Sequence, residues 1–343
     1  MNKKLMALAV AGACVAPTAM AQTANPVTLY GRVYVMFESV EAKGGPSSAT
    51  QSSRTRVSDQ SSLLGVRGTE DLGGGLKAFF QLETAFNPDG GGNTYATRNS
   101  GIGLQGGWGS ILMGRWDSPY KVVGYGPDIF GDLTIAGITS ALHDRGNFDA
   151  RLQNVIQYWT PNMGGFQAKL AMTANEDKTA TADPKTFSAN LTYGKGPLKL
   201  QYGYEKKEDQ GGFAKQEGNE LTGEFTMGAF KLALMGEEIK KSGTKKQQNW
   251  LASVIYTAGK HELAYQFQQS KDGGASAAAT QPECDVNTVA YFYNWSKRSQ
   301  LVGLYTKVDN NAAGVCRFGT GALGTLGNGN DQEGFAIGIK HVF

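Results

Sequence analysis

The chain carries few side chains that could perform acid–base or nucleophilic chemistry. Its three histidines are His143, His261 and His341, and no serine or cysteine motif stands beside any of them. A nucleophile needs a base within hydrogen-bond reach, so we assign no catalytic residue. No metal-ligand cluster, phosphate loop or nucleotide motif is visible either, and the sequence predicts neither a metal site nor a cofactor.

Residues 117–150 offer electrostatic chemistry instead. They contain five acids, Asp117, Asp128, Asp132, Asp144 and Asp149, against two bases, Lys121 and Arg145. A connection of this length without its own secondary structure is usually functional, although a solvated polar loop is the alternative interpretation. Acids facing arginines across a wet space would create a transverse field that orients dipolar solutes and selects ions.

Two cysteines remain once an N-terminal leader is removed. Cys284 and Cys316 lie in polar stretches that flank residues 286–307. An exported chain meets an oxidising compartment, where a loop-to-loop disulfide can form. Two free thiols are the alternative, and the spacing does not decide between them.

The element that positions these groups is a β-strand that repeats along the chain. In residues 333–343 Phe335, Ile337 and Ile339 share one face, and the residues between them share the other, which is the period of a strand. The chain stops on Phe343, so this strand needs a partner, and residues 27–40 are the obvious one. Pairing of the first and last strands would close the sheet into a barrel.

Alternating segments, very short turns and longer polar loops recur from one end of the chain to the other. The predicted strands are 27–40, 55–70, 75–87, 97–106, 109–116, 151–161, 165–175, 185–194, 197–206, 218–227, 229–240, 247–257, 260–270, 286–296, 298–307 and 333–343. Sixteen strands is an even count, as in bacterial outer-membrane barrels. The lumen of so wide a barrel must hold water, so the polar faces line it and the apolar faces meet lipid.

Composition agrees with one large membrane barrel. The only long apolar run, Leu5–Ala16, is too short to span a bilayer. It follows Lys3 and Lys4 and precedes Ala19-Met20-Ala21, which predicts a signal peptide at 1–21 and a mature barrel domain at 22–343. Removal of residues 1–21 takes away two lysines and no acids, so the formal charge falls from +3 to +1. That balance gives no support for a nucleic-acid partner.

The chain resembles the trimeric porins of Gram-negative outer membranes, most closely the beta-proteobacterial type. The resemblance is carried by Leu29-Tyr30-Gly31-Arg32-Val33, residues 65–78 with the turn Glu70-Asp71-Leu72-Gly73, residues 103–109, Gly114-Arg115, residues 151–154 with Tyr158 and Pro161, and Lys340-His341-Val342-Phe343. It implies an all-β, 16-stranded antiparallel transmembrane barrel whose third loop, 117–150, folds inward as a constriction.

The resemblance also implies function, partners and location. It implies a homotrimer in the cell outer membrane that passes small hydrophilic solutes and ions by passive diffusion. The implied partners are outer-membrane lipid, lipopolysaccharide, and the barrel assembly machinery acting on the strand that ends at Phe343.

Porins of this type place a basic wall opposite the third loop. Arg32, Arg115 and Arg151 match it by motif, and Arg67 and Lys77 share the inward parity of their strands. Arg98 also matches, but its parity follows the outward Ile102 unless a bulge intervenes. Family matching further implies that Asp128 or Asp132, with Asp117 in the same acidic loop, lies at the constriction. From this set we predict a modest anion preference; scattered solubilising charges are the alternative.

Three rivals to a general porin remain open at this stage. A substrate-specific outer-membrane channel would use aromatic tracks or charge ladders, which sequence alone does not reveal. An adhesin with a plugged lumen would not conduct. An enzyme on a barrel would need the nucleophile–base pair that the sequence lacks.

Overall fold

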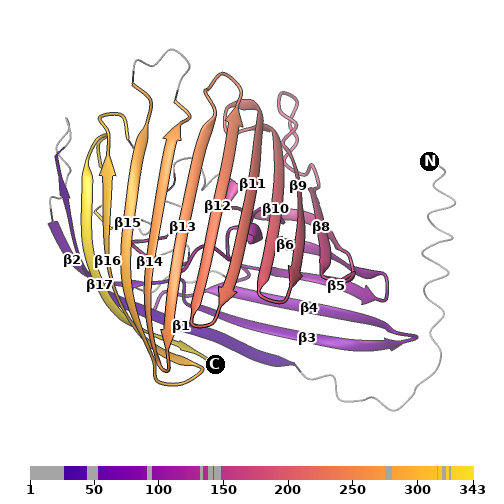
Figure 1. Ribbon diagram of the computed structural model, residues 1–343. Helices are drawn as coiled ribbons and strands as arrows, with labels where there is room; N and C mark the ends of the chain where they lie inside the picture. Colours follow the sequence, from indigo (N-terminus) through magenta and orange to yellow (C-terminus); the bar gives the residue numbers. More distant parts are fainter. Residues whose placement is uncertain are drawn as a thin grey trace.

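The computed structural model describes residues 27–343 except 45–52, 91–94, 132–133, 138–141, 143–147, 275–279, 315, 319–321 and 324–325. Its strands are β1 (Thr28–Lys43), β2 (Ser53–Asp59), β3 (Leu63–Gly73), β4 (Leu76–Ala85), β5 (Ser100–Gly106), β6 (Gly109–Asp117), β7 (Arg151–Trp159), β8 (Phe166–Thr173), β9 (Lys185–Lys195), β10 (Leu198–Gln210), β11 (Phe213–Met227), β12 (Phe230–Lys241), β13 (Gln247–Ala258), β14 (His261–Asp272), β15 (Glu283–Asn294), β16 (Ser299–Asn310) and β17 (Asp331–Val342) (Figure 1). The described residues contain one short 3₁₀ helix, η1 (Lys121–Val123).

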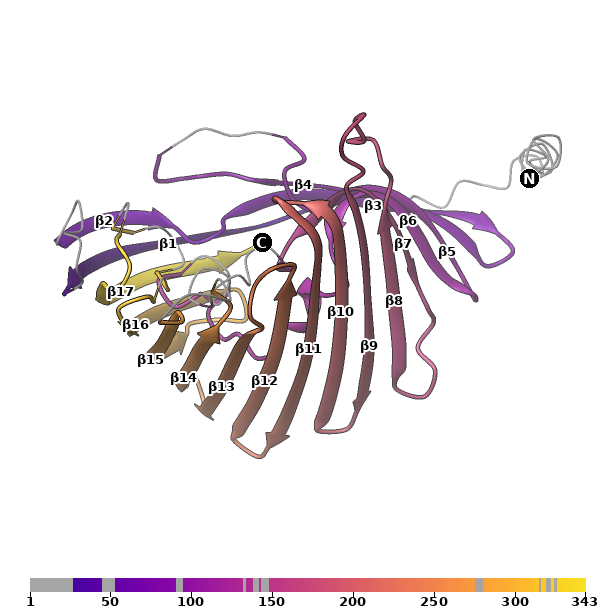
Figure 2. The same ribbon diagram turned by 90° about the horizontal axis from the view of Figure 1, so that it is seen from above.

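The sheet closes between its first and last strands. β1 and β17 pair antiparallel from Arg32 opposite Val342 to Lys43 opposite Asp331. The backbone amides of Gly31 and Phe343 each donate to the other's carbonyl oxygen, at 3.0 Å. From β3 to β17 each strand pairs antiparallel with the next one along the chain, and Figure 2 shows the strands following one another around the curve of the sheet. The predicted pairing of the two ends is therefore confirmed.

Seventeen strands make a 16-stranded barrel because β2 and β3 are two parts of one interrupted strand. β2 pairs with the far half of β1, between Val35 and Glu41, and β3 pairs with its near half, between Thr28 and Arg32. Residues 60–62 separate β2 from β3, and Ser61 takes a left-handed φ of 66°. The sequence predicted one unbroken strand at 55–70, because the alternation continues across the break.

The two faces of the strands differ in the way that the alternation predicts. On the exposed face large apolar side chains remain uncovered, for example Ile102 at 62 % and Leu234 at 66 %. On the other face, which is the inner face of the closed barrel, polar side chains such as Gln266 and Thr288 are fully buried. This inverts the arrangement of a water-soluble barrel and suits a lipid surrounding. No helix within the described residues is long and apolar enough to cross a membrane.

An apolar cluster on the inner face joins strand residues to two connecting segments. Phe130 and Ile135 come from the segment after β6, and Phe318 and Leu323 come from the segment after β16. Cys284 and Cys316 lie in the same cluster and form a disulfide with their Cα atoms 6.2 Å apart. Cys284 belongs to β15 rather than to a loop, so the bridge ties a strand to the segment after β16.

Candidate functional site

The segment between β6 and β7 begins with an anchor on the inner face. The Tyr120 backbone amide donates to Ser188 Oγ on β9 at 3.0 Å, and the Tyr120 hydroxyl donates to Glu237 Oε1 on β12 at 2.7 Å. Tyr120 packs with Phe148 and Ile239, and all three side chains are buried. Because Phe148 lies near the other end of the segment, this cluster fastens both ends to the same wall.

The middle of the segment is held by further wall side chains. Ser253 Oγ donates to the Pro127 carbonyl at 2.8 Å, Gln266 Oε1 accepts from the Ile129 amide at 3.0 Å, and Gln268 donates to the Ala136 carbonyl at 2.9 Å. These partners stand on β13 and β14. The described part of the segment therefore follows the inner wall from β9 to β14, with its backbone polar groups satisfied by inward side chains.

Gly126 shows how closely the segment approaches this wall. A Cβ atom there would lie 1.8 Å from Glu224 Oε1, so a larger residue would have to displace this carboxylate. Glu224 in turn forms ion pairs with Lys199 at 3.1 Å and Lys231 at 2.7 Å. The segment thus rests on a carboxylate that two lysines hold in place.

A cavity of about 410 Å³ separates this segment from the wall on the other side. The segment contributes Tyr125, Ile129, Phe130 and Gly131, and the wall contributes Arg32, Tyr34, Gln60, Ser61, Leu63, Glu83, Arg98, Asn99, Asp117 and Lys340. We call these residues the passage lining. Apolar and aromatic groups therefore face a strongly charged wall across a space that fits a small solute.

Two predicted bases, Arg32 and Arg98, line the passage. Arg32 donates from Nε and Nη2 to the Ser61 carbonyl, at 3.2 and 2.6 Å. Arg98 Nε lies 2.7 Å from Glu83 Oε1, and its Nη1 donates to Ser61 Oγ at 3.1 Å. β5 begins only at Ser100, so Arg98 precedes the strand and need not follow its alternation of inward and outward side chains. Arg98 therefore reaches the passage lining without a β-bulge.

Arg151 reaches the passage only through Asp117. Its Nη2 pairs with Asp117 Oδ1 at 3.0 Å, and its Nε donates to Asn99 Oδ1 at 2.9 Å. Asn99 and Tyr125 also donate to Asp117, at 2.7 and 2.9 Å. Asp117 is the last residue of β6, not a loop residue. Asp117 thus lines the passage, but it lies on the same wall as Arg151 and not across from it.

The other three predicted bases lie outside the passage lining. Arg67 on β3 stands over the Tyr30 ring, with 5.0 Å from its Cζ to the ring centroid. Lys77 is exposed on β4 opposite Gln105. Arg115 lies where the β6–β7 register slips, and its Nε has no hydrogen-bond partner among the described residues.

Of the other acids of this segment, Asp128 and Asp149 are not in the passage lining. Asp128 Oδ1 accepts from the Phe130 amide at 3.0 Å and from Gln266 at 3.5 Å, so the carboxylate stabilises the local turn. Asp149 pairs with Lys121 at 3.2 Å, with both side chains buried. Asp132 lies outside the described residues. The visible acids of the segment thus serve its own folding.

Sequence reasoning missed Lys340 and Glu83. Lys340 on β17 lies 6.0 Å from the Tyr34 ring centroid and has no ion pair among the described residues. The sequence predicts that the Lys340 side chain faces inward, because Lys340 has the same strand parity as the small inward residues Gly334, Ala336 and Gly338. The lining thus holds three cations and two carboxylates, and both carboxylates are already paired with arginines.

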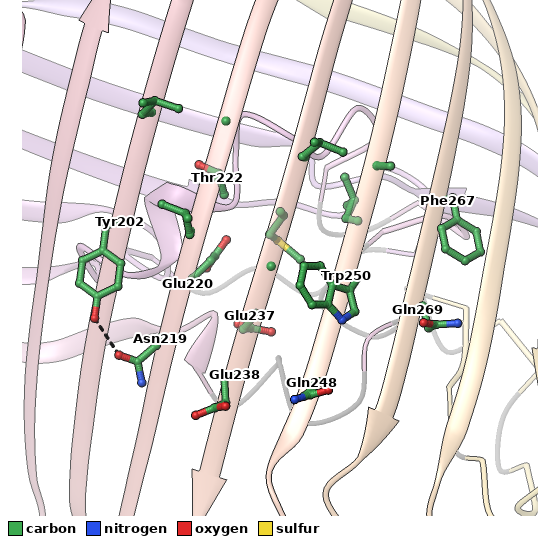
Figure 3. A pocket seen from close by; sticks show the side chains of 18 residues that line it. Tyr202, Asn219, Glu220, Thr222, Glu237, Glu238, Gln248, Trp250, Phe267 and Gln269 are labelled. Atoms are coloured by element: carbon green, nitrogen blue, oxygen red, sulfur yellow. Dashed lines mark hydrogen bonds between the residues drawn. The ribbon is translucent and has the colours of Figure 1, made fainter.

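A larger recess, of about 1070 Å³, lies on the opposite side of the wall. Figure 3 shows its side chains across β10 to β14, with Trp250 near the centre. Leu221 and Leu234 there are more than half exposed, and Gly223 and Gly236 leave room between them. This outward apolar surface carries no chemistry toward the passage.

Neither of the two described histidines is in the passage lining. His261 contacts the Tyr291 hydroxyl at 2.7 Å, and His143 lies outside the described residues. Ser299 Oγ does lie 2.9 Å from His341 Nδ1, a pair that the sequence pattern hid. His341 is exposed and Ser299 is half-buried, and the hydrogen bonds of the described residues place no carboxylate on the other ring nitrogen. The described residues hold no group of three or more metal-ligating side chains.

Comparison with known proteins gives consistent matches. The model of the Gram-negative porin family matches residues 7–313. Outer membrane porin protein 32 of Delftia acidovorans is 31% identical over 370 residues that cover 100% of both chains. The anion-selective porin from Comamonas acidovorans is 28% identical, with a TM-score of 0.79 over 93% of this chain and 100% of that one. The trimer form of OmpT from Vibrio cholerae shares the fold, with a TM-score of 0.70 at 16% identity over 93% and 100% of the two chains.

Proposed function

Because the chain belongs to the Gram-negative porin family, we propose that it is an outer-membrane channel whose passage is narrowed by the segment between β6 and β7. The observation that carries this proposal is the 410 Å³ cavity between residues 125–131 and the charged wall. The segment between β6 and β7 forms hydrogen bonds with side chains of β9, β12, β13 and β14. A segment on the inner side of a closed barrel can contact all four of these strands. Residues 117–150 thus act as the constriction loop.

The channel carries small hydrophilic solutes and ions by passive diffusion, with a modest preference for anions. Among the lining cations, Arg98 is paired with Glu83, while Arg32 and Lys340 have no carboxylate partner among the described residues. Two unmatched positive charges beside a narrow wet space favour anions. The similarity to an anion-selective porin points the same way.

Single-channel recording tests the proposal. The purified protein in a planar bilayer is expected to give ohmic steps in KCl, and a salt gradient is expected to give a reversal potential on the anion side. Steps without ion preference would leave the channel intact and reject the charge assignment. An absence of conductance from correctly folded protein would reject the channel and favour a plugged barrel.

The remaining assignments concern processing and partners. Residues 1–21 act as a signal peptide, and the mature chain 22–343 assembles as a homotrimer, as the trimer form of OmpT does. Exposed apolar side chains around the barrel fit lipid, and the rim contacts lipopolysaccharide, although Lys43 and Lys271 there already pair with Glu41 and Glu283. The barrel assembly machinery binds the strand that ends at Phe343. The protein is a channel and not an enzyme, and it uses no cofactor.

Cross-linking of native membranes followed by mass measurement tests the assembly. Three linked copies are expected, and a monomer at all cross-linker concentrations would contradict the trimer. N-terminal sequencing of the same material should begin at Gln22.

A further inference from the structure

A second cavity lies on the inner wall, nearer the short-turn end of the barrel. It measures about 400 Å³ and is lined by Thr28, Arg67, Gly68, Thr69, Phe79, Phe80, Gln81, Gln105, Ser110, Trp116 and Trp159. These residues stand on β1, β3, β4, β5, β6 and β7, beside the β3–β4 and β5–β6 turns. None of them belongs to the passage lining, so the cavity is a separate place on the route of a solute.

Aromatic rings form one part of this cavity. Trp116 and Trp159 contact each other with ring centroids 5.8 Å apart and planes tilted by 58°. The Trp159 indole N–H already donates to Gln157 Oε1 at 3.0 Å, so its remaining interaction surface is the ring. Both tryptophans are half-buried, although they face water inside the barrel. Trp116 packs partly against the buried cluster of Leu152, Val155 and Ala171, and the exposed parts of the two indole rings provide a stacking surface.

Positive charge forms the other part. Arg67 lines the cavity, and Lys169 Nζ lies 4.7 Å from the Trp159 ring centroid. Neither side chain has an ion pair among the described residues, and the lining contains no carboxylate. Gln105, Thr69 and Ser110 add amide and hydroxyl groups at the rim. Stacking surface, unmatched cations and polar rim together suit a solute that carries both a flat ring and a negative charge.

We propose that this cavity is a binding subsite for small aromatic carboxylates on their way through the channel. The ring of the solute stacks against Trp116 and Trp159, and the carboxylate faces Arg67 and Lys169. A neutral ring lacks the charge contact and a simple carboxylate lacks the stacking contact, so both bind less tightly. The inference rests on the proposed channel function and adds the class of solute that the channel holds.

Titration of single-channel current with three probes tests the subsite. Benzoate carries the ring and the charge, benzyl alcohol only the ring, and acetate only the charge. We expect benzoate to reduce the KCl current saturably, with half-block at a concentration about fivefold lower than for acetate, the gain that one good ring contact gives. Half-block by benzyl alcohol should also need a higher concentration than benzoate, because benzyl alcohol lacks the charge contact. Calorimetric titration of the detergent-solubilised protein should rank the probes in the same order.

Substitutions assign the two contacts. Trp159→Ala and Trp116→Ala should each remove the advantage of benzoate over acetate, and Arg67→Gln should reduce its advantage over benzyl alcohol. Trp250→Ala is the matched control, because that indole lies on the outer face (Figure 3) and should change neither. Two tryptophan variants keep the test decisive if one fails to fold, and circular dichroism of each purified variant shows whether it is folded.

The outcomes separate this inference from the channel itself. Normal KCl conductance with no preference for benzoate would overturn the subsite and leave the channel standing. Equal loss in Trp250→Ala and Trp159→Ala would also overturn it, because the effect would then not come from the lumen. Loss of all conductance in the unmodified protein would instead reject the proposed function.

Discussion

Removing the two unmatched cations of the passage lining should reverse its ion preference. The perturbation is Arg32→Gln with Lys340→Gln, which changes the formal charge of the lining from +1 to −1. The other three charged groups of the lining remain, and two of them, Arg98 and Glu83, stay paired with each other at 2.7 Å. The double variant therefore tests whether unpaired charge, and not the total number of charges, sets selectivity.

The size of the effect follows from the geometry of the cavity. A sphere of 410 Å³ has a radius of about 5 Å, and about 3 Å of van der Waals contact puts an ion about 8 Å from each wall charge. In water the Coulomb energy at that distance is about 0.5 kcal/mol per charge, and 0.1 M salt reduces it by about half. Loss of two positive charges then disfavours an anion by about 0.5 kcal/mol and favours a cation equally. The total of about 1 kcal/mol changes the permeability ratio about fivefold.

The assay is the reversal potential of the trimer in a KCl gradient. The anion-side potential of the unmodified protein should move to the cation side in the double variant. The shift should nearly vanish at 1 M salt, where the Debye length of about 3 Å is much shorter than the distance to the wall. Arg98→Gln with Glu83→Gln is the control for net charge, and Lys43→Gln on the outer rim is the control for position. An unchanged potential in the double variant, or an equal shift in Lys43→Gln, would refute the reasoning.

Three further predictions concern the frame around the passage. Leu234→Arg on the exposed outer face should lower the free energy of unfolding in lipid by about 2–4 kcal/mol, whereas Gln105→Arg on the inner face should cost far less, as measured by denaturant titration of refolded protein. Replacement of Cys284 and Cys316 by serine should cost about 4 kcal/mol on the same assay, since the bridge closes a 32-residue separation. Tyr120→Phe removes a donor from a buried carboxylate, costs about 1–3 kcal/mol of local stability, and should raise the frequency of current flicker.

The sequence was sufficient to predict the barrel because one rule governs nearly every strand. A strand between water and lipid must alternate polar and apolar side chains, so the period of two identifies each strand and the turn residues identify its ends. The last strand shows the rule best, since Phe335, Ile337 and Ile339 lie on the exposed face as predicted. The break at residues 60–62 escaped prediction because both halves of that interrupted strand keep the alternation.

The site was less predictable because side-chain pairing depends on neighbours that are distant in sequence. Arg151 and Asp117 are 34 positions apart, yet they meet where β6 and β7 pair, whereas the resemblance to porins implied an acidic loop opposite a basic wall. Arg98 entered the lining because β5 starts later than the alternation indicates. The inward position of Lys340 follows from the parity of β17, but no motif of the family resemblance assigns this lysine to the basic wall.

The loop acids show why a count of charges gives the wrong intuition about selectivity. Residues 117–150 are acidic in sequence, and an acidic constriction would favour cations. Asp128 is engaged by backbone and amide donors, Asp149 by Lys121, and Asp117 by Arg151. A paired carboxylate presents a dipole to a passing ion, and the field of a dipole falls off faster than that of a charge. The ion therefore responds most to Arg32 and Lys340, whose charge the described residues leave unmatched, and a single new carboxylate beside either one would be enough to retune the channel.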